Sequence, residues 1–282
     1  MNCGIVILAV LNMITADAVG SDDVSTAERL IASPRVLVIA HRGNSGHFPE
    51  NTRPSFQSAV EIGADLVELD YYHSADRIPT VFHDKTLDRT TDAKTVLGRE
   101  KIPVESLPLA ELRRLDAGAW FNARFRGTTI PSLEDALDVI QQGSSTLIER
   151  KGGDARTCVD LLQRKQLLSE VVVQSFDWSF LRQCHRLAPT LVLGALGSKE
   201  LTEDKLEEIQ KTGSRVVGWD QKEIGQREIE AIHRRGLRAW VYTVNDPQRA
   251  QELIRAGIDG IITDFPEEML KLRTSLAAEE AP

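Results

Sequence analysis

Residues 35–70 decide the fold, and they read RVLVIAHRGNSGHFPENTRPSFQSAVEIGADLVELD. Arg35–Ala40 is a short apolar run that stops at His41. Pro54–Ile62 then spaces its apolar residues as a helix does, and Ala64–Leu69 is a second apolar run. Both runs are apolar on both sides of the pleat, as buried parallel strands are. The stretch therefore predicts a strand, a crossover helix and a second, parallel strand.

The same alternation continues along the chain and gives eight expected strands. They are Arg35–Ala40, Ala64–Leu69, Thr146–Glu149, Val171–Gln174, Thr190–Leu193, Arg215–Gly218, Arg238–Tyr242 and Gly260–Ile262. Helical patterns lie between them, at Pro54–Ile62, Leu133–Gln142, Asp154–Lys165, Trp178–Leu187, Thr202–Lys211, Arg227–Arg235 and Pro247–Ala256. Such alternation predicts an α/β protein, a closed (β/α)8 TIM barrel. The alternative is a doubly wound open sheet, but no strand opens into the G-x-G-x-x-G of a dinucleotide site.

Several helix ends carry their own signals. Ser132, with Asp135 three residues later, predicts a capping box. Gly213, Gly236 and Gly257 stand where a helix is expected to end in a left-handed residue.

The pattern of the first residues is typical of a targeting segment. Gly4–Ile14 is an apolar run too short to span a bilayer, and Ala16–Ala18 fits a small-x-small cleavage site. We therefore expect residues 1–18 to be a signal peptide, although no Lys or Arg precedes the run, and a periplasmic or secreted protein; a cytoplasmic one is the alternative. At the other end, residues 275–282 are expected to form a flexible tail.

Composition limits the partners. The 282 residues carry a formal charge of −8 and are only 5% aromatic, with acidic and basic residues interspersed. We expect neither nucleic-acid binding nor stable membrane insertion, and nothing in the sequence fixes an oligomeric state. Beyond Cys3, the cysteines are Cys158 and Cys184, which fit two buried thiols better than a disulfide.

Polar and ionisable residues cluster at the carboxyl ends of the expected strands, whereas fewer of them lie at the amino ends. In order, these ends are His41–Gly43, Glu68–Asp70, Glu149–Lys151, Ser175–Asp177, Gly194–Ala195, Trp219–Asp220, Thr243–Asn245 and Thr263–Asp264. Barrel enzymes carry their chemistry at this rim. The asymmetry places the functional site there.

Three of these residues form a candidate metal site. Glu68 and Asp70 are two positions apart on one strand, so their side chains share a face. Glu149 ends the next barrel strand. Two close carboxylates repel each other unless a cation or proton lies between them, and an all-oxygen set suits Mg²⁺, Ca²⁺ or Mn²⁺. The alternative is a set of exposed acids in ordinary loops.

His83 is placed by a predicted hairpin. A turn between Asp76 and Arg77 would put Asp70 opposite His83, on the same face. A capping or core histidine is the alternative.

His41 ends the first strand, and Arg42 follows it. Two imidazoles beside a divalent ion predict a phosphodiester site, where one removes a proton from the attacking group and the other protonates the leaving alkoxide. With the three acids, a divalent ion, Arg42 and Lys151, the site would carry +1, which suits a phosphodiester monoanion.

In order and spacing, these motifs resemble the glycerophosphodiester phosphodiesterase family from about Val36 to Pro266. The matching segments are His41–Gly43, Pro49–Thr52, Glu68–Asp70, His83–Asp84, Leu87–Thr91, Glu111–Leu112, Ile130–Leu133, Glu149–Lys151, Gln174–Asp177, Thr243–Asn245 and Thr263–Pro266. The resemblance implies a barrel domain over residues 33–272, with a small insertion at about 85–129 between the second and third barrel strands. It implies hydrolysis of glycerophosphodiesters to an alcohol and glycerol 3-phosphate.

The resemblance also implies roles for individual residues. Glu68, Asp70 and Glu149 would hold the divalent cation, Ca²⁺ or Mg²⁺. His41 would be the base and His83 the acid. Arg42 and Lys151 would contact the phosphate.

Four places depart from the family pattern. Arg77 stands where the hairpin usually has Gly, Tyr71–His73 where smaller or apolar residues are usual, Arg150 where an apolar residue is common, and Tyr242 where Trp is usual. Tyr242 would form a wall of the substrate pocket, so the departures bear on the alcohol group. A lysophospholipase D or sphingomyelinase D-like enzyme and a non-catalytic phosphoester-binding barrel are the alternative functions.

Overall fold

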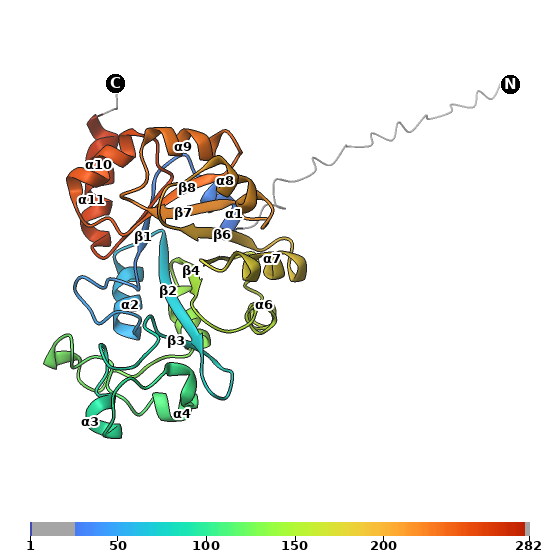
Figure 1. The fold of residues 1–282 in the computed structure, drawn as a ribbon. Coiled ribbons are helices and arrows are strands. Elements are labelled where there is room, and N and C mark those ends of the chain that lie inside the picture. The colour runs from blue at the N-terminus through green and yellow to red at the C-terminus, as the bar shows by residue number, and fades with distance from the viewer. Residues whose placement is uncertain (2–25, 280–282) are drawn as a thin grey trace.

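A computed structural model describes Met1 and residues 26–279, and eight of its strands form a closed parallel barrel (Figure 1). The barrel closes because β1 pairs with both β2 and β9. The barrel strands are β1 (Leu37–Ala40), β2 (Leu66–His73), β4 (Ser145–Arg150), β5 (Val171–Ser175), β6 (Val192–Gly197), β7 (Val216–Asp220), β8 (Arg238–Tyr242) and β9 (Gly260–Thr263). The predicted (β/α)8 fold is confirmed, and each expected strand overlaps one of these.

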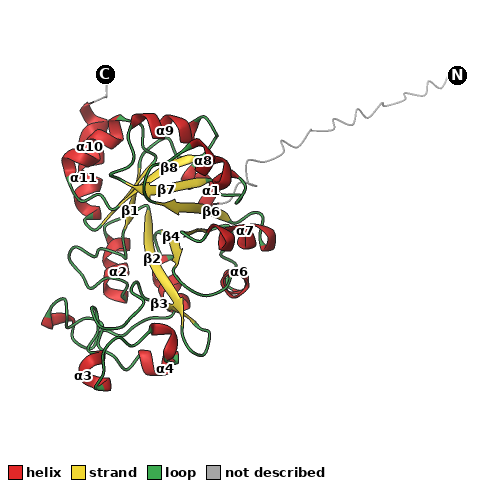
Figure 2. Cartoon of the chain, in the orientation of Figure 1, coloured by secondary structure: helices red, strands yellow, loops and turns green. Residues whose placement is uncertain are grey.

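Helices surround the barrel, as Figure 2 shows. They are α2 (Arg53–Glu61), α5 (Leu133–Ile140), α6 (Ala155–Arg164), α7 (Trp178–Leu187), α8 (Glu203–Gln210), α9 (Gln226–His233), α10 (Pro247–Arg255) and α11 (Pro266–Glu279). The capping box at Ser132 is present, and Gly213, Gly236 and Gly257 have the expected positive φ values of 79°, 70° and 90°. The sequence patterns did not predict α11.

Apolar side chains fill the inside of the barrel and form what we call the apolar plug. The opening at the carboxyl ends of the strands, which we call the mouth, is polar. Inward-facing residues of successive strands meet in one buried cluster, which contains Leu37, Ile39, Leu66, Leu147, Val172, Val192, Val216, Trp240 and Ile262. Because side chains alternate along a strand, the inward residue that follows Leu66 is Glu68, and the one that follows Leu147 is Glu149. The alternation of side chains along β2 and β4 that buries Leu66 and Leu147 therefore also places Glu68 and Glu149 at the mouth of the barrel.

A short helix that the sequence patterns did not predict closes the other end. α1 (Thr26–Ile31) lies before the predicted start of the domain at residue 33. Its Ala27 and Ile31 are buried against the apolar plug. The amide of Ala27 donates to the carbonyl of Ser169 at 2.9 Å.

The hairpin after β2 forms, but its predicted register is wrong by one residue. β3 (Pro79–Val81) pairs Tyr71 with Val81, so the backbone of Asp70 bonds to Phe82 and not to His83. The turn has three residues instead of two. Arg77, the last of them, has φ 61°, and its amide donates a hydrogen bond to the Ser74 carbonyl. That left-handed residue adds the position that shifts the pairing.

Residues 85–129 form the predicted insertion, drawn in green shades at the bottom of Figure 1. Its short helices are α3 (Ala93–Leu97), η1 (Val104–Ser106), α4 (Leu109–Leu112) and η2 (Ala123–Phe125). They enclose a separate core of Phe82, Leu87, Ala93, Ile102, Val104, Leu107, Leu112, Leu115, Ala117 and Ile130. The insertion is therefore a small packed unit attached to the barrel.

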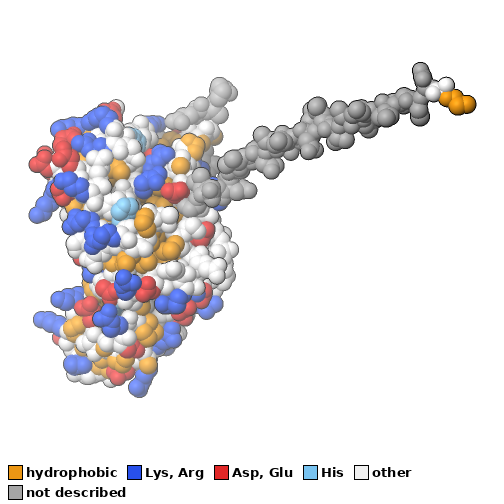
Figure 3. Space-filling model, turned by 90° about the vertical axis from the view of Figure 1, so that its right-hand side faces the viewer, with side chains coloured by type: hydrophobic (Ala, Val, Ile, Leu, Met, Phe, Trp, Pro, Cys, Tyr) orange, Lys and Arg blue, Asp and Glu red, His pale blue; other side chains and the backbone are white. Residues whose placement is uncertain are grey.

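The remaining expectations concern surface, cysteines and ends. On the face in Figure 3, basic and acidic side chains are interspersed. Cys158 and Cys184 are buried free thiols, as expected. The predicted signal peptide, apart from Met1, lies outside the described residues, as do residues 280–282; α11 continues through residues 275–279 of the predicted tail. No helix in the described part combines the length and apolarity that crossing a bilayer requires.

Replacing Ser132 by alanine is expected to lower the free energy of unfolding by about 1 kcal/mol, because the Asp135 amide loses its side-chain acceptor. Urea denaturation followed by circular dichroism measures this. Ser275→Ala is the control, since the Ser275 hydroxyl donates to carbonyls of its own helix. Equal losses in the two variants would contradict the capping role.

Candidate active site

Three carboxylates meet where β2 and β4 open into the mouth of the barrel. The register pairs Asp70 with Glu149, and Glu68 lies two positions deeper on β2. One oxygen from each acid lies within 4.8 Å of the others, and the residues are 1%, 1% and 7% exposed for Glu68, Asp70 and Glu149. The predicted acidic cluster is therefore present and buried.

The donor set of this cluster fits a hard divalent cation. Buried Glu68 Oε1 has no hydrogen-bond donor, and Asp70 Oδ1 and Glu149 Oε1 share a single cation, the Lys151 ammonium, at 3.3 and 2.5 Å. Burying carboxylate oxygens without partners is costly. An oxygen-binding ion such as Ca²⁺ or Mg²⁺ would satisfy all three acids at once.

Burial and mutual repulsion set the charge states of the acids. Burial, with Asp70 and Glu149 nearby, raises the pKa of Glu68 well above its usual range. Burial and Asp70 raise the pKa of Glu149 to about 7. For Asp70 burial acts in the same direction, but Lys151 and Arg42 outweigh it and lower its pKa. In the metal-free protein, Asp70 is thus the most firmly ionised of the three.

Arg42 and Lys151 offset this negative charge. Arg42 has φ 54°, a left-handed conformation that aims its amide at Glu68 Oε2, 2.8 Å away. Its Nε lies 3.3 Å from Asp70, and its Nη1 donates to Glu50 at 2.8 Å. Counted with all three acids ionised, these two cations leave the cluster with a formal charge of −1.

The His41 ring forms a hydrogen bond with the carboxylate of Asp264. Its Nδ1 lies 2.6 Å from Asp264 Oδ1, and Asp264 also accepts from the Ser45 hydroxyl at 3.0 Å and the Asn245 amide at 2.6 Å. Although burial acts the other way, these bonds lower the pKa of Asp264 to about 2. An ionised carboxylate only accepts, so in the neutral form of the His41 ring the hydrogen lies on Nδ1 and the free lone pair is on Nε2.

His83 repeats this arrangement from the insertion side. Its Nδ1 lies 2.6 Å from Asp84 Oδ1, and Arg89 and the histidine together lower the pKa of Asp84 to about 2. Burial lowers the pKa of His83 itself; Asp70 opposes this shift, while Arg42 and Lys151 add to it. His83 therefore releases a proton more readily than a free imidazole does.

The predicted site residues surround one hollow of about 170 Å³. It is lined by His41, Arg42, Glu68, His83, Glu149, Lys151, Gln174, Phe176, Leu196, Tyr242, Thr243 and Ile262. Seven of the eight predicted site residues are in that lining. The eighth, Asp70, is buried beside Arg42 and Lys151. The one-residue error in the hairpin register thus did not remove His83 from the site.

Sequence reasoning missed the apolar wall of this hollow. Phe176 and Leu196 lie after or near the ends of β5 and β6, and Phe176 is 49% exposed. The Phe176 ring meets Tyr242 edge-on at 6.0 Å between centroids. Tyr242 donates its hydroxyl to the Gly197 carbonyl at 2.7 Å. The position of Phe176 at a strand end was the available signal.

Asn51 and Thr52 are residue types that often cap a helix, and they stand just before α2. The Thr52 side chain, however, makes no cap bond and donates to the Pro49 carbonyl. The Asn51 amide donates to Asp70 Oδ2 at 2.8 Å and its oxygen accepts from the Asp70 amide at 3.2 Å. Asn51 therefore positions a carboxylate of the acidic cluster.

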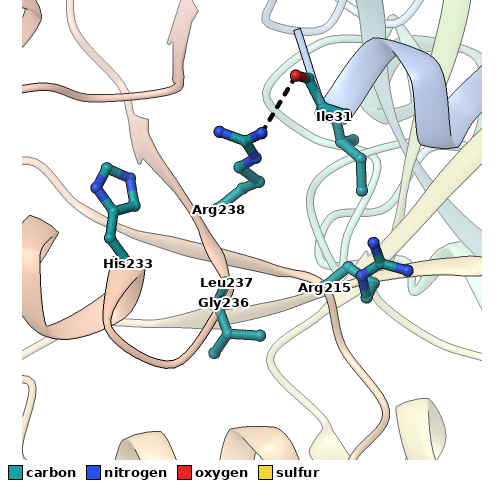
Figure 4. Close-up of a pocket in the computed structure, with 7 residues that line it drawn as sticks. Ile31, Arg215, His233, Gly236, Leu237 and Arg238 are labelled. Atoms are coloured by element: carbon teal, nitrogen blue, oxygen red, sulfur yellow. Dashed lines mark hydrogen bonds between the residues drawn. The ribbon is translucent and has the colours of Figure 1, made fainter. Parts of the chain in front are cut away.

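A larger hollow of about 300 Å³ lies at the opposite end of the barrel, beside α1 (Figure 4). Arg238 and His233 are both bonded to Asp259, and Arg215 lies 3.2 Å from Glu28. Its basic groups are thus already neutralised, and its lining has no counterpart of the acidic cluster. The mouth is the better candidate for catalysis.

Comparisons with known proteins agree with this geometry. The profile of the Glycerophosphoryl diester phosphodiesterase family matches residues 41–268. A glycerophosphodiester phosphodiesterase of Bacillus subtilis (strain 168) is 33% identical over 267 residues, covering 86% of this chain and 88% of the relative. The structure of an Oleispira antarctica phosphodiesterase in complex with the product sn-glycerol-3-phosphate has a TM-score of 0.76 at 29% identity, covering 84% of this chain and 96% of its own.

A glycerophosphodiester phosphodiesterase from Agrobacterium tumefaciens has a TM-score of 0.72 at 26% identity, over 84% of this chain and 99% of its own. The family profile begins at His41 and takes in every residue of the acidic cluster and both histidines. On sequence and fold together, the chain belongs to the glycerophosphoryl diester phosphodiesterase family.

Proposed function

We propose that the protein hydrolyses glycerophosphodiesters to an alcohol and glycerol 3-phosphate. The observation that carries this proposal is a single hollow shared by two imidazoles, each backed by an ionised carboxylate, and by the acidic cluster with its two cations. Family membership and the names of the relatives support the enzyme class, a phosphoric diester hydrolase. The glycerol 3-phosphate in the Oleispira antarctica structure supports the same product here.

His41 and His83 would transfer the protons. Nε2 of His41 takes the proton of the attacking hydroxyl, which is the 2-hydroxyl of the substrate glycerol or a water molecule, as its oxygen bonds to phosphorus. The P–O bond to the leaving alcohol breaks, and His83, which enters the step as the imidazolium, gives its Nε2 proton to that oxygen and becomes neutral. If the 2-hydroxyl attacks, the product is a cyclic phosphate. Water then opens it, with the two proton transfers reversed.

The charged groups would bind and orient the phosphate. Arg42 and Lys151 line the hollow and would contact its nonbridging oxygens. Glu68, Asp70 and Glu149 would hold Ca²⁺ or Mg²⁺, which when bound stabilises negative charge on the phosphoryl oxygens. With all three acids ionised, a divalent ion would change the formal charge of the acids, Arg42 and Lys151 from −1 to +1, which favours a phosphodiester monoanion.

The volume of the hollow favours a glycerol that carries no acyl chain. About 170 Å³ suits a glycerophosphoryl unit, and an acyl chain would have to lie outside, against Phe176. This is why we place a lysophospholipase D or sphingomyelinase D-like activity second. We also propose export from the cytoplasm, which rests on the apolar run within residues 1–18.

The proposed function predicts that turnover requires a divalent ion. Chelation should abolish turnover of glycerophosphocholine, and added Ca²⁺ or Mg²⁺ should restore it. Calorimetry should show Ca²⁺ affinity falling as the pH drops through about 7, because Glu149, with its raised pKa, must lose a proton before it binds the ion. Glu149→Gln should lose the affinity, and Glu134→Gln on the surface of α5 should keep it. Full activity in excess chelator would contradict the proposal.

The second prediction separates the histidines. With glycerophosphocholine, both His41→Ala and His83→Ala should lower kcat by about 10²–10⁴-fold. With the p-nitrophenyl diester of glycerol phosphate, His83→Ala should retain most of its kcat, because nitrophenolate leaves without a proton, while His41→Ala should not. The opposite pattern would exchange the two roles. Binding of the diester without turnover by the unmodified protein would instead indicate a non-catalytic phosphoester-binding barrel.

The third prediction concerns the substrate. Glycerophosphocholine should have the higher kcat/KM in a metal-supplemented assay with lysophosphatidylcholine as competitor, because the hollow accommodates a glycerophosphoryl unit but not the acyl chain that the lysolipid carries on its glycerol. Preference for the lysolipid would favour the lysophospholipase D alternative.

A further inference from the structure

Arg89, in the insertion, uses both edges of its guanidinium on two carboxylates of the site. Its Nε and Nη2 donate to Asp84 at 2.6 and 2.9 Å. Its Nη1 and Nη2 donate to Glu50 at 2.7 and 2.7 Å. Such paired bonds fix the plane and direction of each carboxylate, which a single bond does not.

The Nη2 atom of Arg89 lies at the centre of a continuous chain of contacts. It donates to Asp84 Oδ1, the same atom that holds His83 Nδ1 at 2.6 Å. It also donates to Glu50 Oε1, the same atom that accepts from Arg42 at 2.8 Å. One nitrogen thus connects the partner of a proton-transfer group with the partner of a phosphate contact.

The insertion core determines where Arg89 lies. Leu87, two residues earlier, is fully buried in that core, and its amide donates to the Ile102 carbonyl at 3.0 Å. Thr91, two residues later, is 9% exposed and its hydroxyl donates to the Leu87 carbonyl at 2.6 Å. The segment that carries Arg89 is therefore fixed on both sides before its side chain reaches the site.

From these contacts we infer that Arg89 is a positioning residue, through which the insertion sets the orientation of His83 and Arg42. The inference rests on the proposed function, since it assigns Arg89 a role in that reaction. Asp84 alone is a partly exposed carboxylate beside a loop histidine, with a side chain 26% exposed. Arg89 restricts its rotation, and it is also the largest cause of the low pKa that keeps Asp84 ionised. Lysine would keep the charge but cannot make the two paired contacts.

The test compares two leaving groups in one set of variants. The readout is the ratio of kcat for glycerophosphocholine to kcat for the p-nitrophenyl diester of glycerol phosphate. This ratio does not change if part of the enzyme is merely unfolded. The variants are Arg89→Met, Arg89→Lys, the benchmark His83→Ala, and the control Arg113→Met. Arg113 forms an ion pair from the insertion to Asp135 of the barrel side, and its side chain is 45% exposed against 44% for Arg89.

The ratio is expected to fall about ten- to a hundredfold in Arg89→Met, because a misdirected His83 protonates the choline alkoxide poorly. Arg89→Lys should behave like Arg89→Met, His83→Ala should fall further, and Arg113→Met should keep the parent ratio. The inhibition constant of inorganic phosphate should also rise several-fold in both Arg89 variants, because Glu50 no longer holds Arg42 in place.

An unchanged ratio in Arg89→Met beside a reduced one in His83→Ala would overturn the inference and leave the proposed function intact. A parent-like ratio in Arg89→Lys would show that charge suffices, and would overturn the role of the paired contacts. An equal fall in Arg113→Met would reduce Arg89 to an anchor of the insertion. An unchanged ratio in His83→Ala would remove the acid role of His83, and the inference with it.

Discussion

Repulsion among three carboxylates buried in a space less than 5 Å across is the constraint on which the rest of the site depends. Burial strengthens that repulsion, because the surroundings screen charge less than water does. Two neighbouring strands bring the acids together, and Arg42 and Lys151 offset only part of their charge. Protons relieve this repulsion in part, as the raised pKa values of Glu68 and Glu149 indicate. In the proposed reaction a divalent cation would do so instead, and its charge would also attract the anionic substrate.

Much of the fold and the site could be predicted from the sequence, because they follow from short-range periodicity. Apolar runs alternating with helical patterns gave the barrel, and the alternation of side chains placed Glu68 and Asp70 on the inner face. Parallel pairing brought Glu149 to the same rim. These inferences need no knowledge of distant contacts beyond the rule that strand ends meet at one edge.

What could not be predicted depends on local backbone detail or on contacts across the insertion. The left-handed Arg77 added a residue to the turn and shifted the register, which composition alone does not reveal. Asn51 looks like a capping residue in sequence, yet the left-handed turn at φ 57° directs it to Asp70. Arg89 lies 39 residues from Glu50, and no local pattern indicates that the two meet.

In the described part of the chain, the packed interior of the barrel leaves its mouth as the way into the active site. Ala27 and Ile31 seal the end opposite the mouth, and the apolar plug fills the interior between them. Substrate and product therefore use the same opening, so a reaction product must leave before the next substrate enters. A phosphomonoester that lingers between Arg42 and Lys151 would compete directly with incoming molecules. Accumulated phosphomonoester product would then inhibit the enzyme at the active site itself, without a separate regulatory site.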